Sequence, residues 1–398
     1  MQRQMDKPFK VESVTEFLNC IIEGTREAQT KYNFYYRGEK QYYPLRLPNF
    51  YTHEHSEKLV RQGSEFYYRS LINELGRADY SDSFSLFQLL SELQHYEAKT
   101  RMLDISSNPL VALYFATEEN NGVQKNTEDY ESDGHIYIFG EEINHEKFDT
   151  GHTVAIKSAL NLISQEKINT FIIIMSKLIA NLGDRDGLIR YKNGRNRYFL
   201  YESINELLDE ACLWSDFLEL KNENQWIFFG IPLEVILKKD EYDAFCAEVN
   251  DLDSSDSNKV LRNALQQILE EFLELINQRA KLSEKLRYPV RIYEDLTDAH
   301  IMLSSKRTDR LRQQQGAFIY PRFTNADISK AFDDIKKEIH NSIIEKAMSI
   351  RIGDKEYSHI VIPNDKKKVI QNELSLIGVD EGFIYPDIRH RSSALLNR

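Results

Sequence analysis

Polar side chains that could hold a ligand are concentrated in one short stretch, residues 94–116. Within it, residues 101–105 form a short, loosely alternating apolar segment, which predicts a strand. The motif Ser106-Ser107-Asn108-Pro109 then predicts a helix start, because Ser and Asn cap a first turn and proline is tolerated at its first position. A strand that leads into a capped helix directs N–H groups and hydroxyls at one point, which favours an anionic or ribose-bearing ligand. An ordinary capped helix without a ligand explains the same residues.

A second candidate is Arg37, which follows the aromatic run Phe34-Tyr35-Tyr36. Three aromatic residues in a row favour a strand, and Gly38 ends it. An arginine at a strand end can bind phosphate or carboxylate through two parallel N–H donors. A surface ion pair between Arg37 and Glu39 is the alternative.

A third candidate is the segment Gln313-Gln314-Gln315, which leads into Gly316 and a short apolar strand. It could equally be the polar edge of that strand. The fragment His53-Glu54-His55 lacks a further ligand at suitable spacing, so we expect a solvated loop there and no metal site.

The composition is that of a globular chain of 398 residues, 41% hydrophobic, with room for one large core or two domains. Its net charge of −12 argues against a protein that coats nucleic acid, although a local basic groove is compatible with it. The widely spaced Cys20, Cys212 and Cys246 indicate neither disulfides nor zinc, which fits a reducing cytosol. The N-terminus lacks the apolar core of a signal peptide, and no apolar run could span a bilayer. We therefore expect a cytoplasmic protein without membrane contact.

Short strand patterns lie at both ends of the chain, and helical patterns dominate between them. They predict an α+β fold with a small, mostly antiparallel sheet and a large helical middle region. We expect an N-terminal part over residues 1–147, a helical region over 148–305 and a C-terminal part over 306–398. The helical region could dock a partner protein, although packing on its own chain is the simpler interpretation. Strands are expected at residues 34–37, 101–105, 134–139 and 317–320, and helices at 11–26, 56–75, 84–93, 154–163, 171–179, 204–218 and 259–286.

These motifs together resemble the FRG-domain family of bacteria, named for a Phe-Arg-Gly motif near its start. Here the motif is Tyr36-Arg37-Gly38, with Tyr in place of Phe. The other stretches that carry the resemblance are His95-Tyr96, Thr100-Arg101-Met102-Leu103-Asp104, Ser107-Asn108-Pro109-Leu110, Ala112-Leu113-Tyr114-Phe115-Ala116, Arg310, Gln314-Gln315-Gly316, Phe318 and Tyr385-Pro386-Asp387.

The order of the motifs is similar to that of the ADP-ribosyltransferase fold, in which an early arginine, a serine-rich strand end and a late Glu or Gln surround NAD. The resemblance implies an ADP-ribosyltransferase or NAD glycohydrolase that acts as a toxin or phage-defence effector, including abortive infection. Cleavage of the nicotinamide–ribose bond passes through an oxocarbenium-like cation, as glycoside cleavage does. The acceptor would be water, a protein or a nucleic acid. The alternative is a non-catalytic FRG module that senses a nucleotide or nucleic acid.

The resemblance and the residue types together assign roles in this site. Arg37, His95, Ser106 and Gln314 are expected to converge on one pocket and take part in catalysis. Because the late segment offers no Glu, Glu39 or Asp104 is expected to supply the negative charge, and Asp104 is also expected to pair with Arg101 or His95. The residues expected to bind NAD are Arg37, Tyr36, Tyr96, Arg101, Ser107, Asn108 and Gln315.

Overall fold

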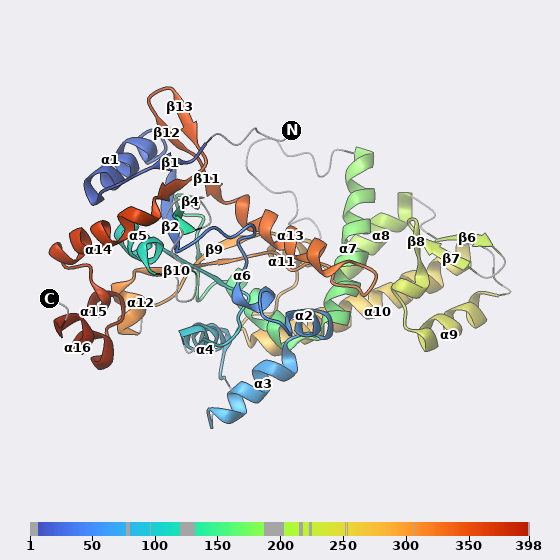
Figure 1. Ribbon diagram of the computed structural model, residues 1–398. Helices are drawn as coiled ribbons and strands as arrows, with labels where there is room; N and C mark the ends of the chain where they lie inside the picture. Colours follow the sequence, from blue (N-terminus) through green and yellow to red (C-terminus); the bar gives the residue numbers. More distant parts are fainter. Residues whose placement is uncertain are drawn as a thin grey trace.

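The computed structural model describes residues 7–76, 80–95, 97–119, 132–186, 203–214, 218–222, 225–250, 252, 254–306 and 308–396. Its architecture is α+β, as predicted, with a central sheet and a helical region that extends to one side (Figure 1). Among these residues no helix is both long and apolar enough to cross a membrane.

The central sheet takes its strands from both ends of the chain. Within the described residues it has nine strands in the order β1-β14-β4-β2-β3-β10-β9-β5, and β11 also pairs with β4. Pairing is mostly antiparallel, as predicted, and among the pairs that the described part of the chain forms in this sheet only β1–β14 and β5–β9 run parallel. The four predicted strands correspond to β2, β3, β4 and β10. The strands are β1 (Phe9–Lys10), β2 (Tyr32–Glu39), β3 (Leu103–Ser106), β4 (Gly134–Glu142), β5 (Lys147–Phe148), β9 (His300–Leu303), β10 (Gly316–Tyr320), β11 (Ala347–Met348) and β14 (Ile360–Ile362).

Helices cover both faces of this sheet. The core on one face includes residues of α1, α5 and α14, and the core on the other face includes residues of α13. A hairpin of β12 (Ile350–Ile352) and β13 (Lys355–Tyr357) packs on α1 (Figure 1). The helices outside the middle region are α1 (Val14–Thr25), α2 (Ser56–Gln62), α3 (Glu65–Glu74), α4 (Ser83–His95), α5 (Pro109–Thr117), α12 (Asp309–Gln313), α13 (Phe332–Ile344), α14 (Lys367–Leu376), α15 (Glu381–Ile384) and α16 (Ile388–Leu396).

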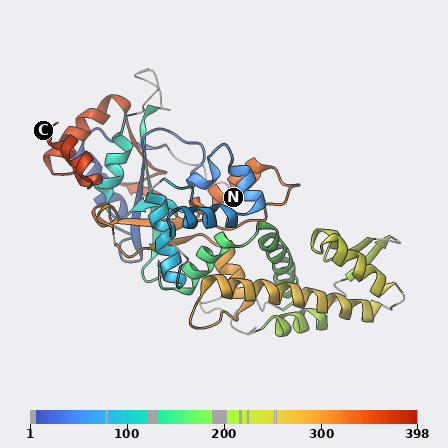
Figure 2. The same cartoon turned by 90° about the horizontal axis from the view of Figure 1, so that it is seen from below.

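The middle region packs in a core that also includes residues of α3, α4 and β10, and in this core the rings of Phe171 and Phe272 stack at 4.2 Å. Helix α10 runs along this region as its longest helix (Figure 2). The region is less purely helical than predicted, because β9 joins the central sheet and three short strands form a second sheet. Its elements are α6 (His152–Ala159), α7 (Gln165–Asp186), α8 (Ile204–Trp214), β6 (Leu218–Asn222), β7 (Gln225–Phe228), β8 (Ile231–Pro232), α9 (Lys239–Val249), α10 (Ser254–Ala280) and α11 (Pro289–Thr297).

The predicted helices have different bounds in the structure, and the one expected over residues 171–179, for example, is the longer Gln165–Asp186. The helix expected over residues 56–75 is two helices, because Gly63 between them has a φ of 93° that a helix cannot contain. The helix expected over residues 259–286 begins at Ser254 and ends at Ala280, and the Asn277 side chain binds the backbone of Leu286 beyond it. The helix expected over residues 204–218 ends at Trp214.

Helix α5 lies directly against the backbones of β2 and β4. A Cβ added at Gly38 would lie 1.8 Å from the carbonyl oxygen of Ala112, and one at Gly134 would lie 2.2 Å from that of Ala116. The helix begins as predicted, because the Asn108 side chain accepts a hydrogen bond from the Leu110 N–H at 3.0 Å and proline occupies the first position. Glycine on the strands and alanine on the helix together permit this close approach.

We expect Gly38→Ala to lower the free energy of unfolding by about 3 kcal/mol or more, because the new methyl group would overlap backbone atoms that cannot move alone. Urea unfolding of the full chain measures this loss. Gly151→Ala is the control, since the nearest atom to its new Cβ is the Phe148 carbonyl oxygen at 3.1 Å. Equal losses in the two variants would contradict the proposed tight contact between α5 and β2.

Candidate functional site

A cavity of about 230 Å³ opens between β2, β3, α5 and the turn from α12 into β10. It is lined by segments far apart in sequence, among them Arg37, Asp104, Ser106, Arg310 and Gln314. Strands β2 and β3 pair at one position within the described residues, Tyr36 opposite Ser106, so they separate beyond it. The cavity occupies this separation, which explains how residues from both faces of β2 line it.

Arg37 spans the gap between the two strands. Its Nε donates to Glu39 Oε1 at 3.0 Å, and its Nη1 donates to the backbone carbonyl oxygen of Asp104 at 2.9 Å. Its Nη2 makes no hydrogen bond to any described residue, and the side chain remains 24% exposed. Arg37 therefore forms the ion pair with Glu39 that was the alternative to ligand binding, and still has a donor available to a ligand in the cavity.

Glu39 is buried, at 4% exposure, and is placed between two guanidinium groups. Its Oε2 lies 3.5 Å from Nε of Arg46, whose guanidinium stacks on the Tyr137 ring at 3.9 Å. Glu39 is not among the residues that line the cavity. Its carboxylate can therefore hold Arg37 in place, but it does not meet a ligand in this cavity.

Asp104 is exposed on β3, lines the cavity and accepts a hydrogen bond from Gln94 Nε2 at 2.6 Å. The expected pairing with Arg101 is wrong. Because β3 begins at Leu103, Arg101 precedes the strand and does not follow its alternation. Its guanidinium is buried over the ring of Phe50 at 4.2 Å and donates to the Tyr51 hydroxyl at 2.8 Å, away from the cavity where it was expected to bind NAD.

His95 is the last residue of α4, next to Gln94, which lines the cavity. The position of its side chain, and hence its expected pairing with Asp104, lies outside the described part of the structure. Tyr96, expected to bind NAD, also lies outside the described residues. Tyr36 lines the cavity, and burial raises the pKa of its hydroxyl to about 12.

The serine and glutamine side chains of the predicted site bind mainly to the protein itself. Ser106 Oγ donates to the Gln314 carbonyl oxygen at 2.6 Å and accepts from the Asn108 N–H at 2.9 Å. Ser107 Oγ lies 3.2 Å from Gln315 Oε1, and Gln314 Nε2 donates to the Ile384 carbonyl oxygen at 2.9 Å. These bonds fix the turn before β10. Among the described residues that line the cavity, Asp104 is the one carboxylate.

Arg310 lines the same cavity but was assigned no role from the sequence. Its guanidinium lies 4.9 Å from the centre of the Tyr385 ring, and its buried Nε has no hydrogen-bond partner among the described residues. The Tyr385 hydroxyl donates to Glu118 at 3.0 Å, and burial raises the pKa of that carboxyl group. The spacing of Arg310 and Gln314, one helical turn apart in the late motif, is the signal that could have identified this arginine.

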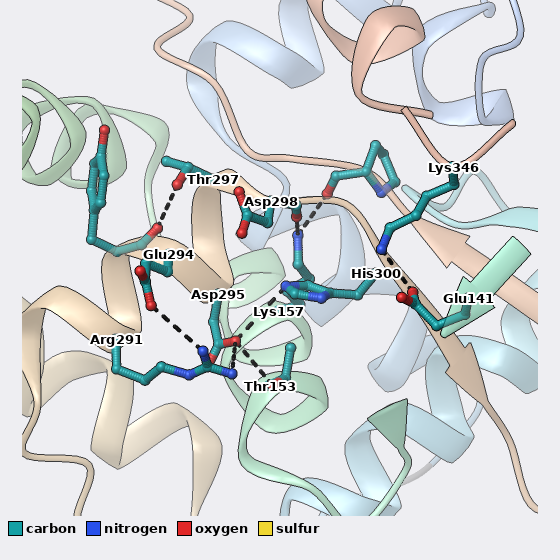
Figure 3. Close-up of polar contacts among 12 residues, drawn as sticks. Glu141, Thr153, Lys157, Arg291, Glu294, Asp295, Thr297, Asp298, His300 and Lys346 are labelled. Carbon is teal, nitrogen blue, oxygen red and sulfur yellow. Dashed lines mark hydrogen bonds and ion pairs between the residues drawn. The ribbon is translucent and has the colours of Figure 1, made fainter. Parts of the chain in front are cut away.

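A second polar cluster joins α6, α11 and β9 (Figure 3). The fully buried Lys157 donates to the carbonyl oxygens of Asp298 and Pro321, both at 2.7 Å, and burial lowers its pKa to about 7. Asp295 Oδ1 accepts from Thr153 Oγ1 at 3.0 Å. The same oxygen lies 3.3 Å from Arg291 Nη2 and 3.8 Å from His300 Nε2. Burial lowers the pKa of His300 and raises that of Glu294 to about 7.

The comparison with family models assigns part of the chain. The model of the FRG domain matches residues 32–125, a span that contains β2, β3, α4 and α5. The protein therefore carries an FRG domain. The matched span provides Arg37, Asp104 and Ser106 in the cavity, whereas Arg310 and Gln314 lie outside it. Comparisons with curated proteins and with solved structures gave no match. Over the described residues, no group of three His, Cys, Asp or Glu side chains could hold a metal ion.

We expect Asp104→Asn to change the free energy of unfolding by less than about 1 kcal/mol, because Asp104 is exposed and its hydrogen-bond donor is a neutral amide. Glu39→Gln should lower it by about 3 kcal/mol, because two guanidinium groups then lose their shared buried carboxylate. Urea unfolding of both variants gives the comparison. A larger loss in Asp104→Asn than in Glu39→Gln would show that the roles assigned to these carboxylates are reversed.

Glu294 should make stability depend on pH. Its pKa is raised by burial from 4.5 to about 7, so between these values the folded chain holds a proton that the unfolded chain has released. The free energy of unfolding therefore falls as pH rises through this range. Glu294→Gln lacks the titrating group, so the wild-type value minus the variant value should show this fall. A difference that stays constant with pH would contradict the raised pKa.

Proposed function

We propose that the cavity holds the phosphate-bearing part of NAD and that the protein cleaves the nicotinamide–ribose bond, as an ADP-ribosyltransferase or NAD glycohydrolase. The observation that carries this proposal is that two guanidinium groups and one carboxylate, from three distant segments, line one cavity. Arg37 and Arg310 supply the positive charge, and Asp104 supplies the negative charge. The segment Gln313-Gln314-Gln315 has no Glu, so Asp104 takes the role that a carboxylate in that segment would have.

The two arginines suit a pyrophosphate, because guanidinium groups present parallel N–H donors to phosphate oxygens. Arg37 is held by Glu39, and Arg310 lies over Tyr385, so both are oriented before a ligand arrives. The cavity volume of about 230 Å³ is below the usual range of about 300–1,000 Å³ for small-molecule sites. We therefore infer that it holds part of the dinucleotide, with the remainder at the exposed rim near Ser107.

Bond cleavage needs no group beyond those in the cavity and the acceptor. The bond between ribose C1′ and the nicotinamide nitrogen breaks, and its electron pair leaves with neutral nicotinamide. The Asp104 carboxylate stabilises the oxocarbenium-like ribose that forms. Water or a nucleophile of a macromolecular acceptor then bonds to C1′ and releases a proton, to Asp104 or to solvent.

The test is nicotinamide release from NAD by the full chain, measured by chromatography together with NAD binding by calorimetry. Asp104→Asn should lower turnover at least about 100-fold while NAD binding persists. Arg37→Ala and Arg310→Ala should weaken NAD binding about 10-fold or more, because each removes a charged donor. Arg312→Ala is the matched control, because it removes an exposed arginine of the same helix that pairs with Asp309 at 3.6 Å.

The outcomes separate the two candidate functions. Nicotinamide release that depends on Asp104 supports the enzyme. NAD binding that depends on Arg37 and Arg310, without release by the wild type, would instead support a non-catalytic nucleotide-sensing module. Equal NAD affinity of Arg310→Ala and Arg312→Ala would contradict both functions at this cavity.

We also propose the setting of this activity, a cytoplasmic toxin or phage-defence effector whose helical region could engage a partner protein. Consumption of NAD would stop the growth of a bacterium that makes the wild-type protein. The growth arrest should be absent with Asp104→Asn and present with Arg312→Ala. Intracellular NAD measured in the same cultures distinguishes NAD consumption from other causes of arrest.

A further inference from the structure

A second cavity, of about 820 Å³, lies among α6, α11 and the segment that connects α10 to α11. It has no lining residue in common with the first cavity. Thr153, Arg291 and Asp295 line it, and they belong to the polar cluster of Figure 3. Its volume falls within the range of about 300–1,000 Å³ typical of small-molecule sites. The residues of its wall indicate which chemistry it could accept.

A hydrogen-bond acceptor lies in this wall. Asp295 is buried, at 2% exposure, and its contacts with the described residues all use Oδ1. Thr153 takes one lone pair of Oδ1, and Arg291 forms an ion pair rather than a hydrogen bond with this atom, so both carboxylate oxygens keep a lone pair for a ligand in the cavity. Hydrogen bonds to a buried carboxylate are strong, because they are charge-assisted and shielded from water. Two adjacent N–H donors on a ligand would match this acceptor.

The cavity also has an apolar wall. Ile156, Leu286 and Ile292 line it and are 1%, 8% and 2% exposed. Tyr288, which is half-buried, lines the cavity as well. Aliphatic side chains and an aromatic ring offer flat contact to a planar heterocycle.

Basic side chains are in excess around this cavity. Lys285 and Arg287 are exposed on the connecting segment, and neither forms an ion pair with a described residue. With Arg291 they give three positive charges against the two negative charges of Glu284 and Asp295, a sum of +1 on a chain whose net charge is −12. A local positive charge on an acidic protein attracts an anionic group such as a phosphate.

We propose that this second cavity binds a guanine mononucleotide. Guanine carries adjacent, parallel N–H donors on N1 and N2, which match the two oxygens of the Asp295 carboxylate. The planar base would lie against Ile156 and Ile292, and the phosphate would meet Lys285 and Arg287. Binding would hold the connecting segment against α6 and α11.

The test is calorimetric titration of the full chain with GMP, IMP, guanosine and inorganic phosphate. GMP should bind saturably, and IMP, which lacks the N2 amino group, should bind about 10-fold more weakly. Guanosine should bind more weakly than GMP because it lacks the phosphate. Raising the salt concentration should weaken the binding of GMP but not that of guanosine. Inorganic phosphate alone should bind weakly or not at all.

Variants locate the binding site. Arg287→Ala should weaken GMP binding about 10-fold without affecting folding, because Arg287 is exposed. Asp295→Asn should abolish the preference for GMP over IMP. Because this variant also loses a buried ion pair and can unfold, the decisive measurements are GMP binding by Arg287→Ala and the comparison of GMP with IMP on the wild type. Arg262→Ala, which removes a half-buried arginine of α10 outside both cavities, and Arg310→Ala, in the first cavity, should bind GMP as the wild type does. Equal affinity for GMP and IMP, unchanged binding in Arg287→Ala, or loss of binding in Arg310→Ala would each overturn the proposal.

Discussion

The contact between α5 and the backbones of β2 and β4 determines where the polar motifs of this FRG domain lie. Gly38 and Gly134 have no side chain, so the helix backbone approaches these strands at Ala112 and Ala116. With the helix axis fixed in this way, its first turn begins at the end of β3, beside the turn that precedes β10. The glycine of the Tyr-Arg-Gly motif thus has a packing role, which is separate from the role of the arginine before it.

Arg37 links this packing to the cavity. Antiparallel pairing continued from Tyr36 and Ser106 would place Gly38 opposite Asp104, but the two strands do not pair there. The carbonyl oxygen of Asp104 accepts a hydrogen bond from the Arg37 guanidinium instead, at 2.9 Å. The arginine thus gives this carbonyl group the partner that a strand N–H would otherwise supply, at the point where the sheet opens. One side chain therefore both bridges the opening of the sheet and places a positive charge beside it.

The strands and the start of α5 could be predicted from local sequence, because their signals are short apolar runs, glycine boundaries and an Asn-Pro cap. The position of Arg101 could not, because it depends on Phe50 and Tyr51, which pack under it only after the chain has folded. The serine hydroxyls had the residue types of a ligand site, yet Ser106 binds the Gln314 carbonyl oxygen. A hydroxyl that fixes a turn and one that binds a sugar look the same in a sequence.

The charge around Arg37 is positive because the guanidinium groups there outnumber the carboxylates that pair with them. Glu39 faces both Arg37 and Arg46, so one negative charge meets two positive charges and a net positive charge remains beside the cavity. Burial of Glu39 keeps water from weakening this arrangement and holds Arg37 in one orientation. An arginine oriented in advance loses less side-chain entropy when an anion binds. The ion pair with Glu39, which at first competes with ligand binding as an explanation of Arg37, is therefore a reason why Arg37 can bind an anion well.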